Sequence, residues 1–133
     1  MREILFRGKR TDTGEWVEGD LVQGVNDQKG HMFIWSENDE SILGVVEFEV
    51  YPETVGQYTG LTDRNGTKIF EGDVVDILTE NEELGVVEYE DGGFLVNADG
   101  FSVDFHTNIN GTDLEIIGNI HDNPELMEGA GQV

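Results

Sequence analysis

The chain contains 133 residues, of which 37% are hydrophobic, and this is enough for one domain with a hydrophobic core. Its 29 acidic residues face only seven Lys and Arg residues, so the formal net charge is −22. Binding to DNA or RNA draws most of its affinity from cations on phosphates, and a chain with so few cations is therefore not expected to bind nucleic acid directly. The absence of cysteine excludes disulfides, a thiol nucleophile and a cysteine-based zinc site.

Glycine and proline usage indicates the type of fold. With 18 glycines and two prolines, the sequence predicts many short strands joined by tight turns. No apolar run approaches the roughly 20 residues that a membrane helix needs, and no basic-then-apolar leader opens the sequence. We therefore expect a cytoplasmic protein that does not contact a membrane.

The first predicted strand, residues 4–6, lies among positive charges. Four cations and one acid occupy the first ten residues, which gives this segment a charge of +3 and leaves −25 for the rest of the chain. No Lys or Arg follows Lys68. The four cations are candidate interface residues, because they could dock on the acidic surface of a neighbouring subunit. They are Arg2, Arg7, Lys9 and Arg10.

Strands are predicted next at residues 16–22 and 31–35, and each carries a tryptophan. Trp16 and Trp35, together with Phe33, could form a binding platform. Packing in a core or an interface is the ordinary role of large aromatic side chains in so small a protein. Trp16 and Trp35 are therefore added to the candidate interface residues.

Three short blocks of sequence recur in the same order. Residues 18–22 (EGDLV) resemble residues 71–75 (EGDVV), residues 44–49 resemble residues 85–90, and residues 53–58 resemble residues 115–120. A shared order of blocks favours two copies of one β module, at about residues 1–59 and 60–124, followed by a short tail at residues 125–133. Modules of roughly 60 residues lie near the lower limit for independent folding, so we expect the two to share a core.

Residues 57–78, called the signature stretch below, are predicted to form a strand, a reversal, a short strand, a second turn and a third strand. Asn65-Gly66 predicts a type I′ hairpin turn, and the carboxylate of Asp63 is placed to accept backbone N–H groups of that turn. The spacing does not match a calcium-binding loop, so no metal site is predicted here. Residues 71–73 form the second turn.

The signature stretch also supplies the candidate binding residues, because polar groups in turns on a rigid framework are well placed to bind a ligand. The competing interpretation is that acidic residues beside glycine serve the turns themselves. The candidates are Gln57, Tyr58, Asp63, Glu71 and Asp73.

The remaining sequence predicts further strands and little helix. Residues 94–96 follow a glycine turn, residues 101–105 alternate apolar and polar side chains, and residues 114–120 form the last strand. The three histidines, His31, His106 and His121, lie on separate segments, which argues against zinc. No catalytic motif is present, and neither a catalytic residue nor a cofactor is predicted.

Three segments resemble the YopX family of small phage and prophage proteins: residues 2–10 (REILFRGKR), 57–75 (QYTGLTDRNGTKIFEGDVV) and 116–126 (IIGNIHDNPEL). The resemblance spans residues 2 to about 126. It implies a mainly β fold of two small, partly open barrel modules of the Src-homology-3-like type, within a single domain at residues 1–124. It also implies assembly into oligomers in the host bacterial cytoplasm, and no established biochemical activity.

The functional hypothesis is a non-catalytic, oligomeric interaction or assembly component. An alternative is an acidic mimic of DNA that inhibits a basic nucleic-acid-binding host protein. Another is a hydrolase or nuclease that uses clustered carboxylates with a divalent metal ion. The acidity itself fits a solvated surface, docking of the basic segment on a neighbouring subunit, or capture of a basic host or phage protein.

Overall fold

The computed structural model describes residues 4–37, 44–78, 83–90, 92–98, 101–105 and 110–126. As predicted, the protein is mainly β: its strands pair antiparallel, and the named helical elements of this part of the chain are three short 3-10 turns. Within the described ranges, no helix is long and apolar enough to cross a membrane. The chain divides into two compact units, Met1–Tyr58 and Thr59–Val133.

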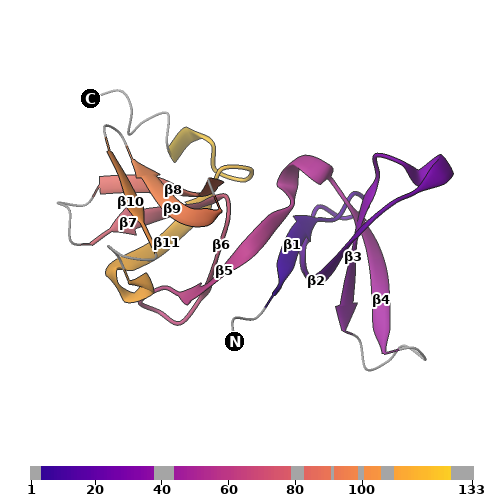
Figure 1. Ribbon diagram of the computed structural model, residues 1–133, viewed down its shortest axis with the longest axis horizontal. Coiled ribbons are helices and arrows are strands. Elements are labelled where there is room, and N and C mark those ends of the chain that lie inside the picture. Colours follow the sequence, from indigo (N-terminus) through magenta and orange to yellow (C-terminus); the bar gives the residue numbers. More distant parts are fainter. Residues whose placement is uncertain are drawn as a thin grey trace. The chain divides into compact units, whose positions relative to one another are not determined.

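The first unit consists of a four-stranded meander and a fifth strand, which pairs with the first strand of the meander. Strands β3 and β4, which pair antiparallel, lie side by side in Figure 1. The strand order is β4-β3-β2-β1-β5, and a 3-10 turn precedes β5. The elements are β1 (Phe6–Lys9), β2 (Trp16–Gln23), η1 (Asn26–Gln28), β3 (Met32–Glu37), β4 (Val45–Val50), η2 (Pro52–Thr54) and β5 (Gly56–Thr62).

The second unit repeats this connectivity. Its strand order is β10-β9-β8-β7-β11, so a meander is again followed by a 3-10 turn and by a strand that pairs with the first of the meander. A short strand, β6 (Lys68–Phe70), lies beside β5 in the sheet order. The other elements are β7 (Asp73–Ile77), β8 (Glu83–Glu90), β9 (Gly93–Ala98), β10 (Phe101–Asp104), η3 (Gly111–Asp113) and β11 (Leu114–Asn119).

Neither sheet closes into a barrel, in line with the partly open modules expected from the sequence. The first unit approaches closure at one corner, where an isolated bridge joins Arg10 to Val50. Beside it, the Tyr51 N–H donates to the Lys9 carbonyl (2.9 Å) and the Thr11 N–H donates to the Glu49 carbonyl (3.0 Å). The end of β1 is thereby attached to the end of β4.

The three recurring blocks do not all lie on equivalent strands. Residues 18–22 lie in β2, the second strand of its meander, whereas residues 71–75 lead into β7, the first strand of the other. Residues 44–49 reach β4 and residues 85–90 lie in β8. Only the last block lies on equivalent strands, because residues 53–58 reach into β5 and residues 115–120 lie along β11, the fifth strand of each unit. The equivalence inferred for the first two blocks is wrong, because short valine-rich segments suit any half-buried strand.

A hydrophobic cluster fills the second unit. Its buried residues come from β6, β7, β8, β9, β11 and the turn after β10, and Leu61, Val103 and Ile116 pack against it. In the first unit Ile34 and Val50 are fully buried. A core shared by the two modules stays a prediction. The buried cluster consists of Ile69, Val75, Ile77, Val87, Phe94, Val96, Ala98, Phe105 and Leu114.

Candidate functional site

The turn of the signature stretch differs from its predicted type. A type I′ turn requires positive φ at both central residues, but only Gly66 has it (φ +83°), and Asn65 does not. The Gly66 N–H donates to the Asp63 carbonyl (3.0 Å) and the Asp63 N–H donates to the Thr67 carbonyl (2.8 Å). The type I′ prediction is wrong: the loop is longer and ends in one left-handed glycine, as in hairpins with a glycine bulge.

The carboxylate of Asp63 holds this loop, as predicted, and also reaches a distant strand. Its Oδ1 accepts the N–H groups of Asn65 (2.9 Å) and Thr67 (3.0 Å), and its Oδ2 accepts the N–H of Ile116 in β11 (3.0 Å). The Arg64 N–H donates to the Leu114 carbonyl (3.0 Å). The Ile116 N–H and the Leu114 carbonyl lie on the edge of β11 that faces away from β7, so the loop covers that edge.

Two opposing effects set the pKa of Asp63, whose side chain is almost fully buried. Removal from water raises the pKa, because it disfavours the charged form. The N–H donors of Ile116, Thr67 and Asn65 and the nearby charge of Arg64 lower it, and the net result is a pKa below the usual value for aspartate. Asp63 is therefore ionised at neutral pH and serves as the anchor of the loop.

Asp73 has a similar local role in the second turn. Its side chain is buried, and Oδ2 accepts the Phe70 N–H (2.8 Å). Gly72 adopts positive φ (+94°), and its N–H donates to the Val87 carbonyl (2.8 Å). The Ile120 N–H donates to the Gly72 carbonyl (2.9 Å), so this turn contacts both β8 and the end of β11.

The five candidate binding residues of the signature stretch do not form one group within a single unit. Gln57 and Tyr58 belong to the first unit, whereas Asp63, Glu71 and Asp73 belong to the second. Gln57 lies opposite Phe6 of β1, Tyr58 is buried, and Glu71 is half-buried at its turn. A binding role for these residues stays a prediction.

The cations of β1 lie over an aromatic ring. Lys9 is directly opposite Trp16 in the β1–β2 register, and Arg7 is opposite Glu18. The guanidinium carbon of Arg7 lies 4.7 Å from the centroid of the Trp16 ring, and the Lys9 Nζ lies 5.9 Å from it. Both distances are in the range of cation–π attraction, so three predicted interface residues form one contiguous cluster. Arg2 lies outside the described residues.

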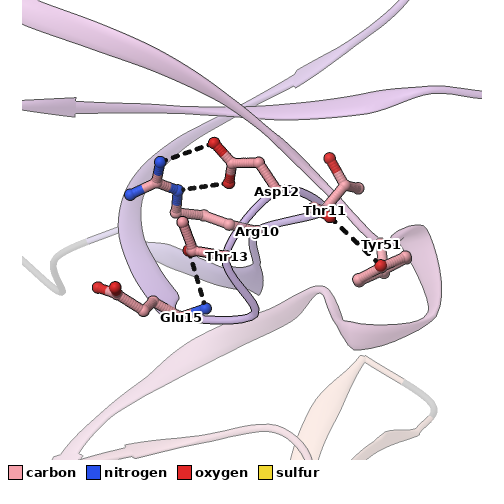
Figure 2. Close-up of polar contacts among 6 residues, drawn as sticks. All are labelled: Arg10, Thr11, Asp12, Thr13, Glu15 and Tyr51. Atoms are coloured by element: carbon pink, nitrogen blue, oxygen red, sulfur yellow. Dashed lines mark hydrogen bonds and ion pairs between the residues drawn. The ribbon is translucent and has the colours of Figure 1, made fainter.

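Arg10 is tied within the loop that follows β1. Figure 2 shows its Nε and Nη2 donating to both oxygens of Asp12 (2.9 and 2.8 Å). Its guanidinium carbon also lies 4.2 Å from the centroid of the Phe48 ring. The hydrogen bonds from Arg10 lower the pKa of Asp12. In the same view the Tyr51 O–H donates to the Thr11 carbonyl (3.4 Å).

Trp35, the remaining interface candidate, lies on the outer face of the β2–β3–β4 sheet with 43% of its surface exposed. Asp20 of β2 and Glu47 of β4 lie directly opposite it on either side. Its indole N–H donates to Glu47 Oε2 (2.7 Å). The two carboxylates were not predicted as partners of Trp35, because only the strand register places them there.

The described residues contain no group of three His, Asp or Glu side chains arranged to hold a metal ion. His31 forms a pair with Glu49, with 2.6 Å between Nδ1 and Oε2. His106 lies outside the described residues.

Fold and site together define an all-β protein of two topologically repeated modules. In the second module, two turns are each held by a buried aspartate that accepts backbone N–H groups. The chain belongs to the YopX protein family, whose model matches residues 5–128.

The fold is also found in a solved structure. The crystal structure of protein EF1440 from Enterococcus faecalis is similar over 96% of this chain and 99% of that chain, with a TM-score of 0.55 and 22% sequence identity. At this identity the likeness bears on the fold alone. Comparison with functionally curated proteins gives no match.

Proposed function

We propose that this protein is a non-catalytic interaction or assembly component that associates with copies of itself. The observation that carries the proposal is the uneven distribution of charge. Residues 59–133 contain 17 acids and two cations, whereas the first ten residues contain four cations and one acid. Opposite charges on different parts of one chain favour contact between subunits.

The cluster of Arg7, Lys9 and Trp16 suits the cationic side of such a contact. Stacking on an indole holds the two cations in place. Side chains that are already ordered lose less conformational entropy on binding. Origin in a phage or prophage and action in the host cytoplasm belong to this proposal and are supported by the family resemblance.

Sedimentation equilibrium tests the proposal. We expect a mass of more than one subunit at low ionic strength, because the contact is electrostatic. The mass should fall toward that of the 14.8 kDa chain at about 1 M salt, where the screening length is about 3 Å. Replacing Arg7 and Lys9 by glutamine should weaken self-association at low salt.

The matched control removes two exposed cations elsewhere, with Lys29 and Lys68 replaced by glutamine. This control changes the net charge by the same amount as the Arg7 and Lys9 substitutions. It should leave the sedimented mass at low salt unchanged. A monomer at low salt would contradict the proposal. So would an equal effect of the two double substitutions, because the charge of β1 would then have no special role.

A further inference from the structure

The outer face of the β2–β3–β4 sheet carries an exposed tryptophan between two carboxylates. Residues directly opposite one another in antiparallel strands project from the same face, so Asp20, Trp35 and Glu47 form a row across three strands. All three are exposed. The hydrogen bond from the indole N–H to Glu47 fixes the orientation of the ring while much of its surface stays in contact with water.

The same face is anionic beyond this row. Glu49 lies opposite Phe33 and therefore projects on the same side as Trp35, and Glu37 lies two residues further along β3. Four carboxylates thus lie on the same sheet face as the indole, and one of them, Glu49, is paired with His31. Such a surface attracts cations, and the exposed ring adds a site on which a cation can stack.

A neighbouring part of the chain contains this arrangement with its cation in place. Arg7 lies over Trp16 at 4.7 Å and directly opposite Glu18, so its guanidinium combines an aromatic face with a nearby carboxylate. Trp35 has the aromatic face and two carboxylates, and its indole N–H is bonded to one of them, Glu47. The geometry around Trp16 shows that these groups suit a guanidinium or ammonium ion.

We propose that Trp35, Asp20 and Glu47 bind an arginine or lysine side chain presented by a basic segment of a different protein. The net charge of −22 favours a basic partner over a second copy of the chain at this face. Arg7 and Lys9 lie over Trp16, and Arg10 is held by both oxygens of Asp12, so these cations already have an aromatic or carboxylate partner within their own chain. The proposal goes beyond self-association and concerns a separate set of residues.

Calorimetric titration of the full chain with acetylated hexa-arginine amide, at about 0.1 M salt, tests the proposal. We expect saturable binding. Trp35→Ala and the double variant Asp20→Asn with Glu47→Gln should each weaken the binding by about tenfold. Trp35→Phe should retain most of the affinity, because it keeps an aromatic face.

The controls remove equivalent groups from the second unit. Glu83→Gln with Glu90→Gln removes two exposed acids, and Tyr89→Ala removes an aromatic ring that is 49% exposed. Each should change the affinity by less than about twofold. Circular dichroism of every variant establishes that it is folded, and the Asp20 and Glu47 double variant keeps the test valid if Trp35→Ala unfolds.

Two outcomes would overturn the proposal. If the Asp20 and Glu47 double variant and the Glu83 and Glu90 double variant weaken hexa-arginine binding equally, the peptide responds to total charge. The Trp35 face is then not a binding site. If Trp35→Ala lowers the sedimented mass but leaves the peptide affinity unchanged, the face is an interface between copies of the chain. The first outcome leaves self-association through β1 untouched, so failure of one proposal is distinguishable from failure of the other.

Discussion

Replacing Asp63 by asparagine should lower the free energy of unfolding by about 2 to 4 kcal/mol, a large share of the stability of a small protein. The carboxylate is 3% exposed and accepts three backbone N–H groups. Asparagine keeps one acceptor oxygen and places an NH2 group against at least one N–H donor. Urea unfolding at pH 7 measures the change.

Asp27→Asn is the matched control, because Asp27 is exposed and the substitution alters the net charge equally. It should change the free energy of unfolding by less than about 0.5 kcal/mol. Equal stability of the Asp63 variant and the wild type would show that the carboxylate does not hold the loop.

The effect of Asp63 should also depend on pH. Its folded-state pKa lies below the ordinary value, so its ionised form contributes stability that is fully present above about pH 4. That stability is lost as the pH falls through the folded-state pKa. The stability difference between wild type and Asp63→Asn should therefore be smaller at about pH 3 than at pH 7.

The second large effect is expected at Gly19, where β2 changes partner. Residues up to Gly19 pair with β1, and residues from Asp20 pair with β3. A Cβ at Gly19 would lie 2.1 Å from the backbone oxygen of Trp35, a distance that requires the strands to move apart. Gly19→Ala should lower the free energy of unfolding by about 1 to 3 kcal/mol.

Gly93→Ala is the control for this prediction. A Cβ at Gly93 meets no atom within 4 Å and the residue does not have positive φ, so the change should be within about 0.5 kcal/mol of zero or slightly stabilising. Thermal unfolding of both variants compares them directly. If Gly19→Ala and Gly93→Ala were equally stable, the backbones of β2 and β3 would not approach each other closely at Gly19 and Trp35.

Local features of the signature stretch could be predicted from sequence, and long-range ones could not. Asp63 bonds to Asn65 and Thr67 within four residues, and the Asx pattern indicates this. Its hydrogen bond to Ile116 joins residues 53 positions apart and depends on where the fold places β11. The turn type was missed because Asn-Gly favours a two-residue loop, whereas the bonds of Asp63 stabilise a longer one.

The two Glu-Gly-Asp blocks show why a repeated motif does not fix a repeated structure. Gly72 is required because its φ is +94° in a turn, whereas Gly19 is required because a carbonyl approaches it in the middle of a strand. Asp73 is buried and accepts a backbone N–H, whereas Asp20 is exposed beside Trp35. The duplicated topology was nevertheless predicted from the shared order of three blocks, although only the last of them lies on equivalent strands of the two units.

The interface candidates were predicted by residue type alone. Charge and aromatic content pointed to Arg7, Lys9 and Trp16, and the register then brought them into one cluster. The acids beside Trp35 could not be singled out among 29 acidic residues, because their position depends on the pairing of three strands.

Amide hydrogen exchange of Ile116 at neutral pH tests most directly whether the signature loop is anchored to β11. We expect this amide to be protected in the wild type, and we expect Asp63→Asn to accelerate its exchange more than that of Val75 in the adjacent strand. If the Ile116 amide exchanges in the wild type at the rate of an exposed loop amide, the carboxylate of Asp63 does not anchor the loop to β11.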